Sequence, residues 1–198
     1  MQNQLLKEAN EFQEKLSAWR RALHQIPEIG LHLPKTVAFV KKELEQMDIP
    51  YTVYEESSCI VALIGSGEKC FMLRSDMDAL PVREESGEPF ASENGCMHAC
   101  GHDMHTTTLL GAAKLLKSHE RELKGTVKLL FQSAEETFQG AKAAVDAGVL
   151  ENPRVDAAFA MHVAPNSENK KIIYGEYPMT SVYGSVSYTH LTLPTILR

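Results

Sequence analysis

The sequence has no hydrophobic run long enough to cross a membrane. Its longest apolar stretches, such as VALIG, LLGAA and AAFAM, fall far short of the roughly 18–20 residues that a transmembrane helix needs. The N-terminal segment MQNQLLKEANEFQEK also lacks the charged and then apolar layout of a secretory signal. We therefore expect a cytoplasmic protein with no membrane partner.

Positive charge is also scarce. The chain has 20 Lys and Arg against 26 Asp and Glu, which gives a formal net charge of -6. Nucleic acids bind basic surfaces, so we expect no nucleic-acid partner. The 198 residues, 43% of them hydrophobic, are enough for one sizeable domain with its own core.

Cysteine is sparse, and the four residues present do not suggest a disulfide framework. Cys59 and Cys70 lie in apolar, strand-like runs and are predicted to be buried thiols. Cys100 differs from them because it stands among histidines.

Alternating helix-like and strand-like segments predict the fold class. Apolar residues at helical spacing over 3–25, such as Trp19 and Leu23, predict an N-terminal helix that Pro27 ends. The segments that follow are predicted helices at 34–47, 104–118 and 141–150, and predicted strands at 51–54, 60–64, 71–74, 126–132, 157–162 and from 172 onward. The turn Gly65-Ser66-Gly67 predicts a hairpin between the second and third strands. This order indicates an α/β layered domain with a largely parallel sheet flanked by helices.

Polar side chains gather where three of the predicted strands end. Asp76 and Asp78 follow one strand, Glu135 and Glu136 follow another, and His162 closes the apolar run AAFAM. In sheets of this kind, ligands bind beyond the carboxyl ends of the strands. We therefore expect these side chains to converge on one site.

The densest group of chemically active side chains is the segment 98–105, HACGHDMH. Thiolate and imidazole are common ligands of zinc-like ions, and a Cys-x-His pair just before a helix places Cys100 and His102 on one rigid turn. Asp103 is expected to cap that helix through its carboxylate. For His98 and His105 taken singly, a position in a solvated loop without a ligand role is an equally good interpretation.

Two pairs of carboxylates complement this segment. On an extended chain Glu135 and Glu136 point in opposite directions, so one can bind a metal while the other acts as a general base on water. Asp76 and Asp78 are two residues apart and turn to one side. Such a carboxylate can accept the free ring N–H of a metal-bound histidine and fix its tautomer; the alternative is an Asp that caps a turn.

Six stretches together resemble the motifs of the co-catalytic metal-dependent amidohydrolases: RRALHQIPEIG, RSDMDALPV, HACGHDMHTTTLLGAA, LLFQSAEET, GA and AMHV. That family includes hydrolases of the hippurate, indoleacetyl-amino-acid and N-acetyldiaminopimelate type, within the aminoacylase/carboxypeptidase metallopeptidase group. The segment HACGHDMH carries the most specific part of the resemblance. His24 lies in the first stretch and receives no chemical role.

The resemblance implies two divalent metal ions (Zn, Mn, Co or Ni) that activate water to cleave the amide bond of a small N-acyl amino acid substrate or a related small amide. It implies four metal ligands: Cys100, His102, Glu136 and His162. Cys100 would bridge the two ions. Glu135 would be the catalytic general base, and Asp78 would support the reaction by orienting a ligand.

The resemblance also bears on the extent of the chain. Family members are longer, and continue into an inserted lid or dimerisation domain before they return to the catalytic domain with one more metal-binding histidine. We therefore expect residues 1–184 to be the N-terminal part of the catalytic domain, truncated before the lid, with the parent a homodimer through that lid. The fragment itself is expected to be inactive. The string VSYTHLTLPT resembles a translated sequencing adapter, so residues 185–198 are expected to be a non-native tail and His190 is not assigned as a ligand.

Two other interpretations stay open. A thiol-dependent hydrolase would use Cys100 as a nucleophile with a histidine. A non-catalytic zinc-binding module would be built from Cys96, His98, Cys100 and His102. Both interpretations leave the adjacent carboxylates at positions 135 and 136 without a function.

Overall fold

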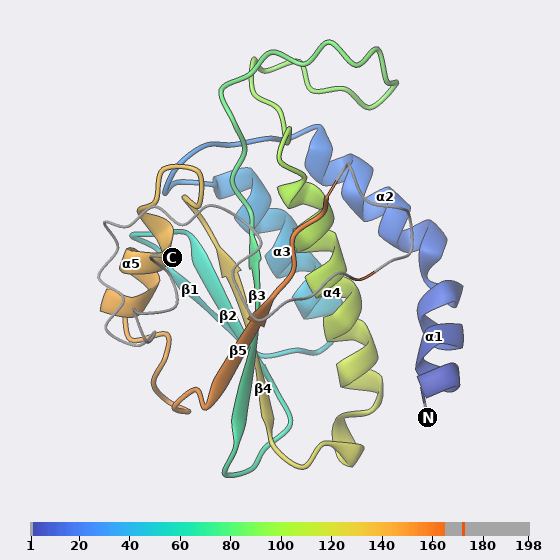
Figure 1. Ribbon diagram of the computed structural model, residues 1–198, viewed down its shortest axis with the longest axis vertical. Helices are drawn as coiled ribbons and strands as arrows, with labels where there is room; N and C mark the ends of the chain where they lie inside the picture. The colour runs from blue at the N-terminus through green and yellow to red at the C-terminus, as the bar shows by residue number, and fades with distance from the viewer. Residues whose placement is uncertain (1, 165–171, 173–198) are drawn as a thin grey trace. The chain divides into compact units, whose positions relative to one another are not determined.

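The computed structural model describes residues 2–164 and residue 172 (Figure 1). The chain divides into two compact units, Met1–Val163 and Ala164–Arg198, and the fold is that of the first. The elements in chain order are α1 (Gln2–Glu11), α2 (Gln13–His24), α3 (Pro34–Gln46), β1 (Tyr51–Tyr54), β2 (Cys59–Ile64), β3 (Cys70–Asp76), α4 (His102–Ser118), the 3-10 helix Glu120–Glu122, β4 (Thr126–Gln132), α5 (Gly140–Asp146) and β5 (Ala157–Ala160). The predicted strand beyond residue 172, the domain boundary after residue 184 and the non-native tail 185–198 lie outside the described residues.

The five strands form one mixed sheet in the order β1-β2-β4-β3-β5. Strand β3 is parallel to both of its neighbours, β4 and β5, whereas β2 is antiparallel to β1 and β4. The predicted α/β class, a sheet flanked by helices, is confirmed, but the sheet is mixed and not largely parallel as predicted, because two of its four strand pairings are antiparallel. Because β4, β3 and β5 run in the same direction, their carboxyl ends lie at one edge of the sheet.

The predicted hairpin between β2 and β3 is wrong, because β4 lies between these strands. The glycines of that turn instead let the chain pass close to the start of β4. A Cβ atom added at Gly65 would lie 2.7 Å from the carbonyl oxygen of Gly125. A Cβ atom at Gly67 would lie 2.9 Å from the Cα of Gly125. The turn therefore needs small residues for backbone contact with the strand that separates β2 from β3.

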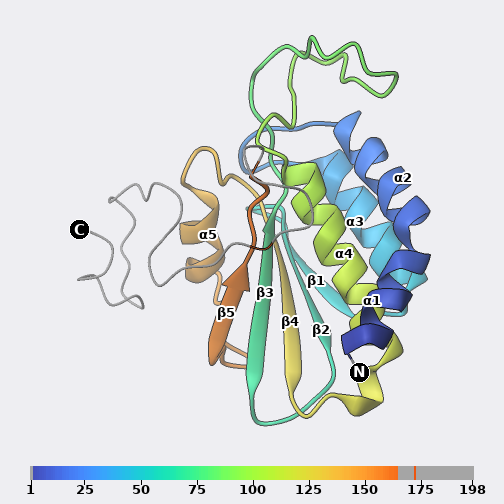
Figure 2. The same cartoon turned by 45° about the vertical axis from the view of Figure 1, so that its right-hand side comes forward.

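Helices cover the two faces of the sheet unequally. Figures 1 and 2 show α2, α3 and α4 on one face and α5 on the other. The larger hydrophobic core lies between the sheet and α3 and α4, where Leu44, Leu110 and Phe131 are fully buried. A smaller core on the α5 side includes Cys59; Cys59 and Cys70 are both buried and free, as predicted. Burial on both faces fixes the strand register, because a slip of one residue would exchange the two faces.

The N-terminal segment forms two helices instead of the one predicted. Helix α1 ends at Glu11 and α2 begins at Gln13, with Phe12 between them at φ −95° and ψ 0°. The predicted apolar residues Trp19 and Leu23 are buried on α2. Among the described residues, no helix has both the length and the apolar character needed to cross a bilayer.

Candidate metal centre

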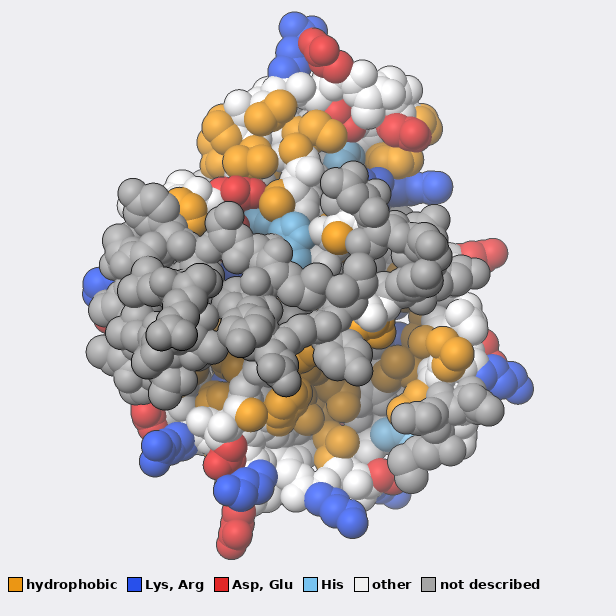
Figure 3. All heavy atoms as spheres, viewed as in Figure 1, with side chains coloured by type: hydrophobic (Ala, Val, Ile, Leu, Met, Phe, Trp, Pro, Cys, Tyr) orange, Lys and Arg blue, Asp and Glu red, His pale blue; other side chains and the backbone are white. Residues whose placement is uncertain are grey.

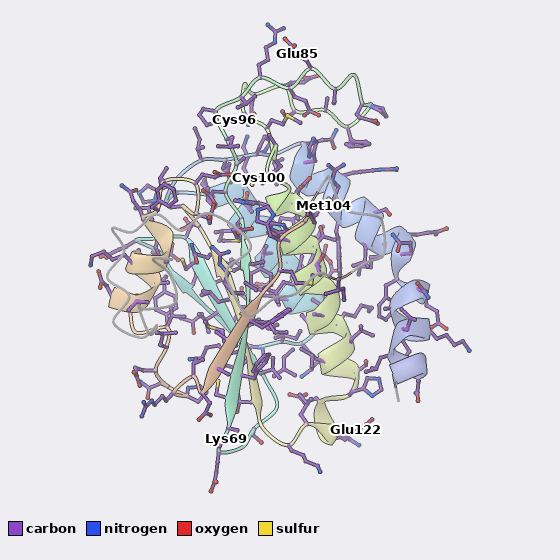
Figure 4. The ribbon with its side chains drawn as sticks, in the orientation of Figure 1. Lys69, Glu85, Cys96, Cys100, Met104 and Glu122 are labelled. Atoms are coloured by element: carbon purple, nitrogen blue, oxygen red, sulfur yellow. The ribbon has the colours of Figure 1, made fainter. Side chains whose placement is uncertain are left out.

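Three strand ends and the start of one helix meet at one edge of the sheet. Strand β3 ends at Asp76, β4 at Gln132 and β5 at Ala160, and α4 begins at His102. In Figure 4, Cys100 lies beside the first turn of α4 near the ends of these strands. The side chains that follow the strand ends therefore face the start of α4.

His102 occupies the centre of this site. It is 1% exposed, and its Nδ1–H donates to the main-chain oxygen of Asp78 over 2.8 Å. Its Nε2 lies 3.7 Å from Asp76 Oδ1, 3.7 Å from Glu136 Oε1 and 3.8 Å from Glu135 Oε2. These distances exceed hydrogen-bond lengths. They are close to the separation of about 3.4 Å expected for two atoms that each lie about 2.1 Å from a tetrahedral ion.

Glu135 and Glu136 both approach His102, in contrast to the predicted opposite directions. Ala134 has a positive φ of 50°, and residues 135–138 form a turn. Because the chain is no longer extended there, the two-residue alternation that would separate adjacent side chains does not apply. The turn brings both carboxylates to the same side.

Asp78 supports the site with its main chain and its side chain. Its carbonyl oxygen holds the His102 Nδ1–H, and its Oδ1 lies 3.4 Å from the same nitrogen. Its Oδ2 accepts the backbone N–H of Glu136 over 3.0 Å. The main-chain oxygen thus takes the role predicted for the carboxylate, and the carboxylate fixes the turn that carries Glu136.

Cys100 and His162 form the outer part of the site. Cys100 Sγ lies 3.3 Å from His162 Nε2, although the residues are 62 positions apart. His162 follows the end of β5, and its Nδ1–H donates to the Val163 carbonyl over 2.7 Å, which leaves Nε2 unprotonated and facing Cys100 Sγ. Figure 3 shows histidine side chains (pale blue) reaching the surface among hydrophobic side chains on this face.

The electrostatics of the site favour a cation. Burial, and then the neighbouring Glu136 and Glu135, raise the pKa of Cys100 to about 12. Burial also raises the pKa of Glu135. Burial opposes protonation of His102, but the Asp78 side chain, with Oδ1 3.4 Å from His102 Nδ1, and the nearby carboxylates outweigh it, so the net effect is a raised His102 pKa. The raised His102 pKa, and the part of the Cys100 shift that comes from Glu136 and Glu135, indicate an excess of negative charge at the site.

Nine buried side-chain polar atoms of the described residues have no hydrogen-bond partner, and three of the nine gather around this site: Asp78 Oδ1, His102 Nε2 and Glu136 Oε1. We call these three residues the open cluster. An unsatisfied buried polar group costs roughly 1–3 kcal/mol, and three such atoms close together favour the binding of a further ligand. Three groups of potential ligand atoms lie within 4.8 Å of one another, and all three contain His102: Cys100, His102 and His162; Asp76, His102 and His105; and His102, Glu135 and Glu136. Thiolate, imidazole and carboxylate are donors that suit zinc-like ions, so the residues present fit a metal centre.

A second polar group, which the sequence analysis missed, lies at the same turn of α4. His24 is 2% exposed, with Nδ1 2.6 Å from Asp103 Oδ2 and Nε2 3.0 Å from Glu84 Oε1. The remaining carboxylate oxygens are used as well, Asp103 Oδ1 by the Met104 N–H and Glu84 Oε2 by the Ser92 N–H. We call His24, Glu84 and Asp103 the closed cluster.

Asp103 is not the N-cap residue of α4 as predicted, although its carboxylate does accept one N–H of the first turn, that of Met104. The N-cap of α4 is Gly101, with a φ of 86° and no side-chain cap hydrogen bond. Asp103 is fully buried and pairs with Arg20 Nε over 2.8 Å in addition to His24. Both partners of Asp103, Arg20 and His24, lie on α2 and are distant in the chain. The one sequence feature that pointed to this cluster was the position of His24 in the stretch RRALHQIPEIG.

Cys96 and His98 do not join the metal-capable groups of the described residues. His98 is 4% exposed, and burial lowers its pKa to about 4. Cys96 lies farther out on the loop that precedes α4 (Figure 4). In the part of the chain that the structure describes, the predicted alternative of a four-residue zinc module is therefore not formed.

Comparison with known proteins identifies the family. Residues 72–191 match the family described as "Peptidase family M20/M25/M40". The chain belongs to this peptidase family. The M20 chain is 45% identical over 181 residues to the IAA-amino acid hydrolase ILR1-like 4 of Arabidopsis thaliana, an alignment that covers 90% of this chain and 41% of the relative. It is 42% identical over 157 residues to the N-acetyl-L-cysteine deacetylase of Bacillus subtilis (strain 168), covering 78% of this chain and 37% of the relative.

A solved structure supports the same assignment. A Bacillus subtilis protein described as a dinuclear metal binding peptidase from the M20 family matches the M20 chain with a TM-score of 0.75 and 39% identity, over 79% of this chain and 45% of that one. The predicted resemblance to metal-dependent hydrolases of this group is confirmed. The M20 chain spans less than half the length of these relatives.

Proposed function

We propose that this M20 chain carries the catalytic site of a metal-dependent hydrolase that cleaves the amide bond of N-acyl amino acids or related small amides. The observation that carries the proposal is the open cluster, whose buried polar atoms have no protein partner among the described residues. A divalent ion would satisfy His102 Nε2 and Glu136 Oε1, and its charge would compensate the Asp78 carboxylate.

The residues proposed to hold two divalent ions are Cys100, His102, Glu136 and His162. The 3.3 Å between Cys100 Sγ and His162 Nε2 supports a shared ion, and Glu136 Oε1 lies 3.7 Å from His102 Nε2. When bound, Zn, Mn, Co or Ni would supply a Lewis acid that polarises an amide carbonyl and acidifies water. Asp78 is proposed to keep His102 Nε2 and the Glu136 side chain directed at the ions.

Glu135 is the side chain proposed to move the proton. Its raised pKa brings it towards neutral pH, where a general base is most effective. Its side chain is 36% exposed, so that water and substrate reach it from outside. Glu135 would accept a proton from the attacking water and return it to the departing amine.

The substrate class is proposed from the activities in the relatives' names. One relative is an IAA-amino acid hydrolase and the other is an N-acetyl-L-cysteine deacetylase. In both cases an acyl group is removed from an amino acid, which is the reaction that a general base and a Lewis acid at this site would support. The thiol-dependent alternative lacks such support, because burial and the neighbouring Glu136 and Glu135 raise the pKa of Cys100 in the absence of metal, whereas a thiol nucleophile needs a lowered pKa.

We also propose that the chain is the N-terminal part of a longer cytoplasmic enzyme, because it spans 41% of the plant hydrolase and 45% of the solved peptidase. A homodimer formed through a lid domain belongs to this proposal, and so does a non-native tail at 185–198, against which stands the family match that extends to residue 191. The complete reading frame from an overlapping clone tests it. A frame that continues past residue 184 into a sequence unlike residues 185–198 is the expected result, and genomic codons for 185–198 would contradict it.

The proposed reaction is tested by exchanging Glu135 for Gln in the enzyme expressed from its complete reading frame. Loss of a general base typically lowers turnover by about 10²–10⁴-fold, and the metal content is expected to stay unchanged. Glu85→Gln, on the exposed loop (Figure 4), is the matched control and should keep full turnover. Unimpaired hydrolysis by Glu135→Gln would contradict the proposed role.

A further inference from the structure

His105 lies one turn after His102 on α4, and both of its ring nitrogens have partners. It is 5% exposed, with Nδ1 2.6 Å from Asp76 Oδ1 and Nε2 2.9 Å from the backbone nitrogen of Val163. Residues three apart on a helix share a face, so His105 lies beside the proposed metal centre. The sequence analysis left its role open, and the proposed function does not use it.

The hydrogen bonds determine the tautomer of His105. A backbone N–H can only donate, so His105 Nε2 must accept the Val163 N–H and carry no proton. The ring proton therefore lies on Nδ1 and donates to Asp76. Asp76 is itself fixed, by Arg74 Nη1 at 2.6 Å from Oδ2 and by the Thr106 hydroxyl at 2.8 Å from its main-chain oxygen. His105 thus links a rigid strand end to the backbone beyond β5.

The Val163 residue that His105 holds also orients His162. The Val163 carbonyl accepts the His162 Nδ1–H over 2.7 Å, and His162 Nε2 consequently faces Cys100 Sγ. The rings of His105 and His162 are in direct contact, with centroids 4.6 Å apart at an interplanar angle of 71°. One residue, Val163, therefore connects the buried His105, through its N–H, to the ring of His162, through its carbonyl.

Little else in the described fold holds this segment. The last pair of β5 with β3 joins Ala160 to Arg74, so the sheet ends two residues before His162. Met161 is 44% exposed and His162 is exposed. The second contact is made by the Val163 side chain, which packs so closely on Gly101 that a Cβ there would lie 2.5 Å from Val163 Cγ2.

We propose that His105 is a positioning residue, which holds Val163 and thereby aims His162 Nε2 at the ion shared with Cys100. This inference rests on the proposed function, because it takes His162 as a metal ligand. It adds a residue that acts on the metal centre through two hydrogen bonds and the backbone of one residue, Val163, without contacting the ion.

The test compares His105→Phe, which keeps a planar ring without hydrogen bonds, with His105→Gln, which can donate to Asp76 and accept from Val163. Zn²⁺ affinity is measured on the full chain by competition with a chromophoric chelator, and Co²⁺ spectra report the ligand set. Removing a group that orients a ligand typically weakens metal binding about 10–100-fold. We expect this loss in His105→Phe, with a Co²⁺ spectrum shifted towards that of His162→Ala, and partial recovery in His105→Gln. His32→Phe, on the exposed surface, is the matched control and should bind as the wild type does.

Wild-type affinity and spectrum in His105→Phe would overturn the inference while leaving the proposed function intact. Absence of metal binding by the wild type would overturn the proposed function and the inference together. A second measurement needs no variant. Nitrogen-15 spectra of the imidazoles should show His105 protonated at Nδ1 alone, and a His105 proton at Nε2 would overturn the proposed link even if the variants failed to fold.

Discussion

The open and closed clusters use the same kinds of side chain at the same turn of α4, and differ in how completely they are satisfied. In the closed cluster both ring nitrogens of His24 have carboxylate partners. In the open cluster His102 donates one N–H, and its Nε2 has no hydrogen-bond partner among the described residues. A buried polar group without a partner carries a free-energy cost that a ligand can remove. The closed cluster is therefore expected to stabilise the fold, and the open cluster is expected to bind a metal ion.

The largest expected effect on the fold comes from removing the central residue of the closed cluster. His24→Ala leaves the buried carboxylates of Asp103 and Glu84 without their shared partner. Breaking one side of a buried pair typically costs about 3–5 kcal/mol, and we expect a loss of this size in the free energy of unfolding. Urea denaturation of the metal-free chain measures it, with His32→Ala as the exposed control. A loss below about 1 kcal/mol would mean that the closed cluster does not stabilise the fold.

A smaller effect, of opposite sign in the two clusters, is expected from exchanging one Glu for Gln in each. Glu84→Gln removes the charge that His24 and Ser92 hold, and should lower the free energy of unfolding by about 1–2 kcal/mol. Glu136→Gln removes one of several crowded negative charges, and should raise the metal-free value by up to about 1 kcal/mol while weakening metal binding. Urea denaturation in the presence of a chelator measures both. Shifts of the same sign would remove the distinction between the clusters.

The smallest effect expected is a change in the pH dependence of stability. Burial opposes ionisation of Glu84, but hydrogen bonds from Ser86, Ser92 and His24 outweigh it and lower its pKa from 4.5 to about 2. The folded-state pKa lies below the unfolded one, so the stabilisation by Glu84 is complete above about pH 4.5 and is lost as the pH falls through about 2. The difference in melting temperature between wild type and Glu84→Gln should shrink across this window. A difference that stays constant with pH would show that Glu84 is not held ionised by these partners.

The elements of the fold that depend on local patterns could be predicted from the sequence. Helix α3 and strands β1 and β4 match the predicted segments closely, because helical spacing and apolar alternation over a few turns specify them. The insertion of β4 between β2 and β3 could not be predicted in this way. It depends on pairing between segments that are distant in the chain. The sequence of the turn Gly65-Ser66-Gly67 does not indicate that β4 lies between the two strands that the turn connects.

The candidate site shows the same division. Because ligands bind beyond the carboxyl ends of parallel strands, the sequence predicts that Asp76, Glu136 and His162 lie at one edge of the sheet. It does not reveal that Ala134 adopts a positive φ and turns both glutamates to His102. The closed cluster was missed because His24 and Asp103 are 79 residues apart, and no local pattern joins them.

The central claim, that the side chains around the open cluster hold two divalent ions for hydrolysis, is tested most directly by metal stoichiometry. The enzyme expressed from its complete reading frame would be dialysed to equilibrium and its metal content measured against His102→Ala. The account predicts two tightly held divalent ions per chain, a loss of metal in His102→Ala, and turnover that a chelator abolishes and added metal restores. Hydrolysis by wild-type enzyme that contains no metal would contradict it.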